Sequence, residues 1–162
     1  MFNHESPLRG KEFVTQKIVT ELAKVKFNTI PYLKLGNVYS KRDWGYSMDY
    51  VEAMWLMLQK KQPDDFVISS GMTHSVKSFI NKAAKYYGFN LVWSGKGLNE
   101  KASDKTTGKI IVKIDKKFFR PTEVNHLYGD SNKAKKILKW KPKTSFDELI
   151  RLMCSSELSK YK

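Results

Sequence analysis

The sequence holds a single cysteine, Cys154, among 162 residues. One cysteine excludes an internal disulfide and any zinc site built on several cysteines. Because Cys154 lies in an apolar run, we interpret it as a buried helical thiol rather than a nucleophile. No apolar stretch is long enough to span a membrane, and the N-terminus lacks the residue order of a signal peptide. We therefore expect a protein of the reducing cytoplasm.

Arginine is scarce as well. Of the 30 cationic side chains only four are arginine: Arg9, Arg42, Arg120 and Arg151. The first three stand in polar clusters beside proline, glycine or tryptophan. A planar guanidinium binds phosphate through two parallel hydrogen bonds, which an ammonium cannot do. This sparing use predicts a site for an anion of fixed geometry. A lysine-biased composition that left a few arginines by chance is the alternative.

Familiar catalytic motifs are missing from the sequence. It has neither a G-x-G-x-x-G nor a Walker A motif, and no tyrosine is followed four residues later by lysine. The three histidines, His4, His74 and His126, show no metal-ligand spacing, so no metal site is expected. The chain thus combines anion-binding groups with no recognisable catalytic machinery.

Positive charge is abundant. The formal net charge is +14, and the excess of lysine grows toward the C-terminus. Such a field attracts polyanions, and both a nucleic acid and a nucleotide diphosphate fit it. A solvated lysine surface with no specific partner is the alternative. A hydrophobic share of 41% in 162 residues is enough for one packed domain.

Helical and strand patterns alternate along the chain, which predicts the α/β class. Apolar spacing and capping signals predict helices over 11–27, 48–60, 75–88, 131–138 and 146–158. Short strands are predicted at 32–35, 66–68, 91–93 and 110–114, and loops around Arg42 and over 95–108. In the helix over 48–60 we expect Val51, Met54 and Leu58 to face inward.

The polar clusters also resemble a known family. Asn3-His4-Glu5-Ser6-Pro7, Arg42-Asp43-Trp44-Gly45, Phe119-Arg120-Pro121-Thr122-Glu123 and Trp140-Lys141-Pro142 follow the order and spacing of the C-terminal half of GDP-mannose 4,6-dehydratases. These enzymes are extended short-chain dehydrogenases/reductases. The resemblance covers essentially the whole chain. It implies that residues 1–162 form a single C-terminal substrate-binding domain. This domain would be partial relative to the full-length family, and the N-terminal Rossmann nucleotide-binding strands would be absent.

The resemblance assigns roles to individual residues. It implies that His4 and Arg9 contact NADP. It places the GDP-sugar site at Asn3, Lys17, Arg42, Arg120 and Glu123. The family's acid/base tyrosine, its lysine, its threonine or serine and its glutamate come from the half that this chain lacks. No catalytic residue is therefore expected here.

The implied function is the GDP-sugar-binding half of an NADP-dependent hydro-lyase that converts GDP-mannose to GDP-4-keto-6-deoxymannose. Such a half is expected to be inactive alone, with a separately encoded Rossmann half as one partner and with homo-oligomers as in the family. A basic nucleic-acid-binding module and a non-catalytic GDP-sugar-binding protein are the alternatives. The chain lacks the arginine–aromatic interleaving of a base-stacking surface, which argues against nucleic acid. Three positions depart from the family pattern: Leu8, Gln16 and Lys139.

Overall fold

The structure, a computed structural model, describes residues 1–119 and 122–161 and has a mixed α/β fold. Its helices are α1 (Val14–Lys26), α2 (Ser47–Leu58), α3 (Val76–Tyr86), α4 (Asn132–Ile137) and α5 (Phe146–Ser159), with short 3₁₀ helices η1 (Gly97–Asn99) and η2 (Lys116–Phe118). Its strands are β1 (Asn3–Glu5), β2 (Leu33–Leu35), β3 (Lys41–Arg42), β4 (Trp44–Tyr46), β5 (His74–Ser75), β6 (Leu91–Ser94), β7 (Lys101–Asp104), β8 (Ile110–Ile114) and β9 (His126–Leu127). Within the described part, no helix has the length and apolar character to cross a membrane.

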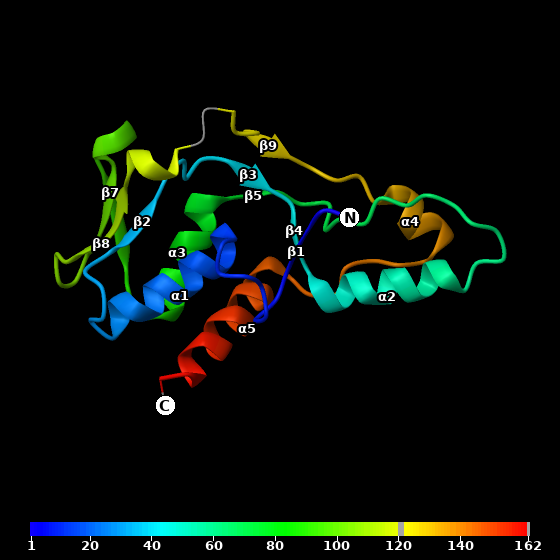
Figure 1. The fold of residues 1–162 in the computed structure, drawn as a ribbon, viewed down its shortest axis with the longest axis horizontal. Helices are drawn as coiled ribbons and strands as arrows, with labels where there is room; N and C mark the ends of the chain where they lie inside the picture. The colour runs from blue at the N-terminus through cyan, green and yellow to red at the C-terminus, as the bar shows by residue number, and fades with distance from the viewer. Residues whose placement is uncertain (120–121, 162) are drawn as a thin grey trace.

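The larger end of the molecule is a four-stranded sheet packed with three helices. The strand order is β2-β8-β7-β6, and α1, α3 and α5 lie together beside it (Figure 1). Strand β2 runs parallel to β8, whereas the other neighbours are antiparallel. The spacing of Val14, Ile18, Leu22 and Val25 predicts the buried stripe of α1. The last three are buried, and Val14 is partly buried against the same core. Buried Cys154 of α5 belongs to the same core, which confirms its interpretation as a structural thiol.

The smaller end consists of α2, α4 and the turn that follows α4. Trp140 is its central side chain and is 2% exposed. The indole Nε1 donates to the backbone oxygen of Asp49 at 2.9 Å, and the ring meets Tyr50 edge to face. The Asp49 carboxylate in turn accepts from the amides of Lys143 and Thr144. These bonds fix α2 against the residues that lead into α5.

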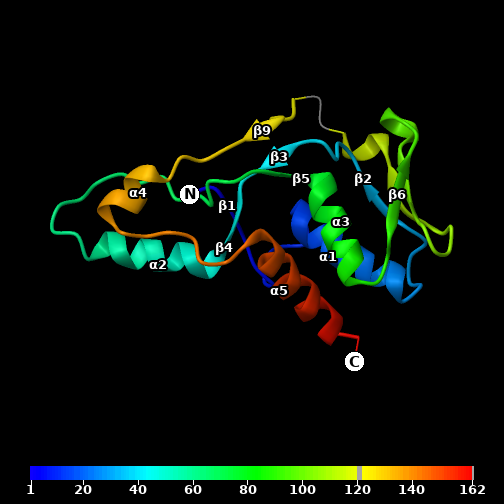
Figure 2. The same ribbon diagram turned by 180° about the vertical axis from the view of Figure 1, so that it is seen from behind.

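Two small sheets join the ends. Strand β1 pairs with β4 in a parallel two-stranded sheet, and β3 lies between β5 and β9 in a three-stranded sheet (Figures 1 and 2). The prediction of a loop around Arg42 is therefore wrong, since β3 and β4 flank Asp43. Their partners lie far away in sequence: Arg42 is in register with His74 and with Leu127. A local sequence signal cannot report such pairings.

Three further predictions differ from the structure. The loop predicted over 95–108 contains β7, which pairs with both β6 and β8. The strand predicted at 66–68 is not a regular strand, although Ile68 is buried and its oxygen accepts from the Phe2 amide. In α2 the predicted inward face is wrong, because Val51 is 50% and Leu58 is 81% exposed. The buried side of α2 carries Tyr50 and Ala53 instead.

The serine caps of α3 and α5 form, whereas α1, α2 and α4 begin without a side-chain cap. The hydroxyl oxygens of Ser75 and Ser145 accept from the amides of Ser78 and Glu148, respectively. In a full capping box the Glu148 side chain would also bond the backbone amide of Ser145. Here the Glu148 carboxylate forms an ion pair with Arg151 instead. Lys139, where the resembled family usually has glycine, adopts φ 55°. Left-handed backbone favours glycine, so this lysine is strained.

Candidate functional site

A hollow of about 320 Å³ collects three of the residues singled out from the sequence. Asn3, His4 and Arg9 line it together with Met1, Phe2 and Leu127. Strand β1 places the first two, because Asn3 and His4 lie in register with Trp44 and Gly45 of β4. The Asn3 amide donates to the backbone oxygen of Asp43 at 3.3 Å. The resemblance assigns His4 and Arg9 to the cofactor and Asn3 to the sugar nucleotide, and in the structure all three line the same hollow.

Arg9 is held at the edge of this hollow by a buried carboxylate. Its Nε lies 3.4 Å from Oε2 of Glu5, and its guanidinium stacks 3.4 Å above the Phe13 ring. Burial raises the pKa of Glu5, although the Thr15 hydroxyl donates to it and Arg9 lies nearby. The ion-pair geometry still leaves the buried Arg9 Nε without a hydrogen bond to any described residue. Arg9 Nε is therefore directed at Glu5 as an ion pair without a hydrogen bond.

Asp43 organises the backbone around the hollow. It is fully buried, and its carboxylate accepts from the Ser70 amide at 2.8 Å, the Ser70 hydroxyl at 2.6 Å and the Gly71 amide at 3.0 Å. A longer contact joins it to the Gly129 amide at 3.4 Å. The sequence places Asp43 in the Arg42–Gly45 motif but predicts no role for it. An acidic residue in a motif does not show which amides and hydroxyls will donate hydrogen bonds to it.

Arg42 and Glu123 form an ion pair beside this network. Arg42 Nη2 lies 3.3 Å from Glu123 Oε1, and Nη1 donates to the backbone oxygens of Lys41 and Val124. Both side chains remain partly exposed, at 19% and 23%. Leu127 connects them to the hollow, since it lines the hollow and lies in register with Arg42. Arg42 thus lies on a strand beside the hollow, although neither Arg42 nor Glu123 lines it.

Lys17 lies on α1, with its ammonium 3.3 Å above the centre of the Phe118 ring. Burial lowers its pKa, and Glu21 and Asp115 oppose that effect. No contact among the described residues joins Lys17 to Arg42 or to the hollow. Arg120, the remaining predicted residue, lies outside the described residues. Lys17 therefore borders the 116–119 segment, and Arg42 borders residues 123–124.

His74, the β5 neighbour of Arg42, gives a pH-dependent prediction. Burial and the charge of Lys82 lower its pKa, against the opposing carboxylates of Asp147 and Asp43. The folded state therefore binds a proton less readily than the unfolded chain, and stability is lost as pH falls below about 6.5, the ordinary value. His74→Phe keeps the ring stacked on Phe146 and is expected to flatten this part of the profile of unfolding free energy against pH.

The matched control for this prediction is His126→Phe, at an exposed position on β9. Urea unfolding between pH 7.5 and 5 measures both variants against the starting chain. The difference between the starting chain and His74→Phe should grow as the pH falls. A difference that stays constant with pH would remove His74 from the titration.

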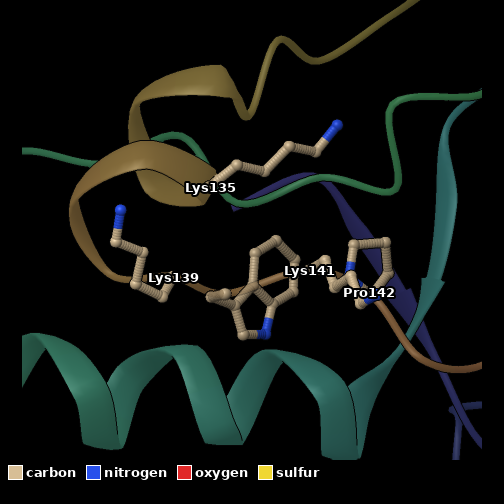
Figure 3. A pocket seen from close by; sticks show the side chains of 5 residues that line it. Lys135, Lys139, Lys141 and Pro142 are labelled. Atoms are coloured by element: carbon tan, nitrogen blue, oxygen red, sulfur yellow. The ribbon is translucent and has the colours of Figure 1, made fainter.

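A larger hollow of about 450 Å³ lies elsewhere, between α4 and the Trp140 turn. It is lined by Lys135, Lys139, Trp140, Lys141 and Pro142. Figure 3 shows the ammonium groups of Lys135 and Lys139 pointing in different directions rather than toward one point. None of the described residues that the resemblance assigns to NADP or to the GDP-sugar lines this hollow. Size alone therefore does not mark the functional site.

A tyrosine–lysine contact also exists in the structure. The hydroxyl of Tyr39 lies 3.3 Å from Nζ of Lys77, and both donate to the buried carboxylate of Glu100, at 2.7 and 2.8 Å. The lysine also lies over the Trp93 ring. Because Glu100 accepts from both groups, the cluster is internally satisfied and links the residues before β3 to the start of β7. It lines neither hollow described above.

The fold is shared with solved structures of other proteins. A bacterial structure, RMD from Pseudomonas aeruginosa complexed with NADPH, aligns with a TM-score of 0.78 at 18% identity, covering 98% of this chain and 46% of that one. The dTDP-glucose 4,6-dehydratase of Bacillus anthracis in complex with NAD aligns with a TM-score of 0.72 at 17% identity, covering 98% and 44%. The chain thus shares its fold with slightly less than half of each of these two proteins.

Sequence similarity identifies the family of this chain. The model of the GDP-mannose 4,6 dehydratase family matches residues 1–153. The human GDP-mannose 4,6 dehydratase is 51% identical over 158 residues, and that of Dictyostelium discoideum is 49% identical over 162 residues. The chain belongs to this family. It spans 42% and 46% of the lengths of these two relatives.

Proposed function

We propose that this chain is the GDP-sugar-binding part of a GDP-mannose 4,6-dehydratase, with residues 1–162 acting as one substrate-binding domain. The observation that carries the proposal is the Arg42–Glu123 pair set beside the hollow of Asn3, His4 and Arg9. Arginine forks suit a diphosphate, and amide and carboxylate groups suit ribose and sugar hydroxyls. The relatives' name supplies the sugar nucleotide.

Each side chain then has a distinct role in binding. Arg42 faces the diphosphate, and Arg120 is proposed to do the same from its place in the motif. Glu123 orients Arg42 through their ion pair and accepts from a ribose hydroxyl. Lys17 adds a point charge, and its lowered pKa reflects partial burial that an incoming phosphate would offset. Asn3 donates to the sugar.

The residues around the hollow fit an anionic cofactor. Arg9 and His4 both line the hollow, and Arg9 carries the positive charge that suits a phosphate group. We propose that these two residues contact NADP. The bound cofactor supplies the hydride chemistry for oxidation at C4 and reduction at C6 of the sugar. The aligned structures from Pseudomonas aeruginosa and Bacillus anthracis are complexes with NADPH and NAD, respectively.

The chain alone is expected not to convert GDP-mannose. It has no glycine-rich pyrophosphate loop and no Tyr-x-x-x-Lys motif, and the Tyr39–Lys77 contact is tied to Glu100. The measurement is chromatography of nucleotide sugars after incubation of the purified chain with GDP-mannose and NADP. Formation of the 4-keto-6-deoxy sugar at a rate above that of a heat-denatured sample would contradict the expectation.

Calorimetric titration tests the binding function itself. GDP and GDP-mannose should bind the chain, and a DNA duplex should bind weakly, with an affinity that falls steeply with salt. Each titration is run at low and at physiological salt. Tight DNA binding without GDP binding would replace the proposal with the nucleic-acid module. The chain could also bind GDP-mannose but show no activity when a Rossmann-containing partner is added. That result would favour a non-catalytic GDP-sugar-binding protein.

A further inference from the structure

The four-stranded sheet has one face that no described α-helix covers. In Figures 1 and 2, α1, α3 and α5 lie together on one side of this sheet, and none of the described α-helices lies over the other side. The covered side is apolar, since Leu33, Val112 and Ala102 are fully buried in the core. The residues next to these three in the sequence point to the opposite side, because side chains alternate along a strand.

That opposite side carries three lysines in one row. By outer face we mean the side of the sheet that bears Lys34, Lys113, Lys101 and Ser94. The register pairs Lys34 of β2 with Lys113 of β8, and Lys113 with Lys101 of β7. Ser94 of β6 is paired with Lys101 and ends the row. Because paired residues lie on the same side and neighbouring strands are about 4.8 Å apart, the three lysines stand side by side over about 10 Å.

Such a row is electrostatically unfavourable for the chain by itself, since like charges directly opposite each other destabilise a sheet. Compensation is found at one end of the row. The Lys34 ammonium lies 3.4 Å from a carboxylate oxygen of Asp115, and the Tyr32 ring centre lies 5.9 Å from Lys34 Nζ and 4.4 Å from Lys113 Nζ. Among the described residues, no acid forms an ion pair with Lys113 or Lys101.

The acids that flank β7 do not neutralise the row either. Glu100 and Asp104 are both 4% exposed. The Glu100 carboxylate accepts from Tyr39 and Lys77, and the Asp104 carboxylate accepts from an amide and a hydroxyl of its own turn. The outer face thus keeps a surplus of positive charge that a bound anion would neutralise.

The spacing and the type of these cations indicate the class of anion. A single phosphate is too small to bridge three ammonium groups spread over about 10 Å, whereas a chain of linked phosphates carries negative oxygens along that length. Carboxylates on one face of an extended peptide recur about every 6.7 Å, which is longer than the step between strands. Lysine binds phosphate as a point charge, without the fixed fork of arginine, and this suits a flexible chain of phosphates.

A single-stranded nucleic acid fits the outer face less well. Proteins that bind such strands stack the bases on aromatic side chains. The ring beside the row, Tyr32, already faces the ammonium groups of Lys34 and Lys113. A chain of phosphates needs no aromatic ring, so the cations alone are enough to hold it.

We propose that the outer face binds a chain of three or more linked phosphates, either free or as the tail of a nucleoside triphosphate. Lys113 is the central contact, with Lys34 and Lys101 on either side of it. The site is separate from the one proposed for the GDP-sugar, because Arg42 stands on β3, which belongs to a different sheet. Binding neutralises the row and therefore stabilises the folded chain.

Calorimetric titration with sodium tripolyphosphate tests the proposal, with saturating GDP present to occupy the site proposed at Arg42. The double variant Lys101→Gln and Lys113→Gln is expected to weaken binding at least tenfold, because it removes two charge-assisted contacts. Lys113→Arg keeps the charge and should bind nearly as the unaltered chain does. The matched control is Lys135→Gln with Lys139→Gln, which removes the same charge from the larger hollow and should change the affinity less than about twofold.

Unfolding by urea, measured with and without tripolyphosphate, adds an independent readout. Without the ligand, the midpoint of the Lys101→Gln and Lys113→Gln variant should be no lower than that of the unaltered chain, because two opposed like charges are gone. Tripolyphosphate should raise the midpoint of the unaltered chain but not that of this variant. If the double variant does not fold, Lys101→Gln alone, at an exposed position, serves in both measurements.

Three results would overturn the proposal. The first is equal weakening by the two double variants, which would mean that tripolyphosphate responds only to net charge. The second is undiminished binding by the Lys101→Gln and Lys113→Gln variant. The third is orthophosphate binding as tightly as tripolyphosphate, since a single phosphate would then be sufficient.

Comparison of ligands distinguishes the two sources of the phosphate chain. GTP that binds at least as tightly as tripolyphosphate, and loses affinity for the Lys101→Gln and Lys113→Gln variant, would identify a nucleoside triphosphate. Tighter binding of tripolyphosphate would identify a free chain of phosphates. If GDP does not bind, the proposed GDP-sugar site fails, and the same titrations without GDP in an Arg42→Ala chain still decide the role of the lysine row.

Discussion

Asp43→Ala is expected to destabilise the fold by about 4 kcal/mol, more than most single substitutions. The variant removes the buried carboxylate that accepts from the Ser70 and Gly71 amides and from the Ser70 hydroxyl. Donors left buried without a partner each cost about 1–3 kcal/mol. The midpoint of urea unfolding at equilibrium measures the loss.

Asp64→Ala is the control for this change. Asp64 lies at the surface and pairs with Lys133, so its removal should hardly move the midpoint. Asp43→Asn keeps the shape of the side chain and one acceptor oxygen, so it can be measured if the alanine variant does not fold. Its new NH₂ group would face the Gly71 amide, which is also a donor, so an intermediate loss of stability is expected. A midpoint for Asp43→Ala equal to that of Asp64→Ala would show that the network does not hold the fold.

Arg42→Ala is expected to weaken GDP binding about 30-fold, which corresponds to about 2 kcal/mol for a charge-assisted hydrogen bond. The side chain is partly exposed, and its backbone lies in register with Leu127 at the hollow. Arg42→Lys keeps the charge but not the planar fork, so it should recover only part of the affinity. Calorimetric titration with GDP measures each dissociation constant.

Arg151→Ala is the matched control, because Arg151 is an exposed residue of α5 paired with Glu148. It should leave GDP affinity unchanged. Arg120→Ala should weaken binding about as much as Arg42→Ala if its motif assignment is right. Equal affinities for Arg120→Ala and Arg151→Ala would remove Arg120 from the site, and an Arg42→Ala variant that binds normally would remove Arg42.

The helices that the sequence predicted best are those with one apolar and one polar face. The spacing of Ile18, Leu22 and Val25 located α1, and serine caps located the starts of α3 and α5. The same method gave the wrong face for α2, because large apolar side chains stand on more than one side of this helix, such as buried Tyr50 and exposed Val51 and Leu58. Periodicity then cannot say which side meets the core, and Val51 was assigned to the wrong face.

Strands β3 and β4 were not predictable for a different reason. They are two and three residues long, and they pair with segments distant in sequence rather than with their neighbours. Asp43 shows the same limit at the level of one side chain. Its donors at Ser70 and Gly129 lie 27 and 86 residues further along the chain. Residue type identified an acid in a motif, but only the folded chain shows what it holds.

The residues of the candidate site come from the family resemblance, and the structure shows how the described ones are arranged. Sequence resemblance selected Asn3, His4 and Arg9, and the structure places them on one hollow. It also selected Arg42 and Glu123, which form an ion pair across 81 residues of sequence. The role of Glu5 as the buried anchor of Arg9 had no sequence signal beyond its place in the same motif. Such a contact depends on the bend between β1 and α1.

Helix α2 leaves two large apolar side chains facing water, since Trp55 is 60% and Leu58 is 81% exposed. Exposed apolar side chains of this size are the kind of surface that chaperones and proteases act on. The lifetime of the chain in a cell is therefore expected to depend on whether these two side chains are covered, because cover would remove that surface.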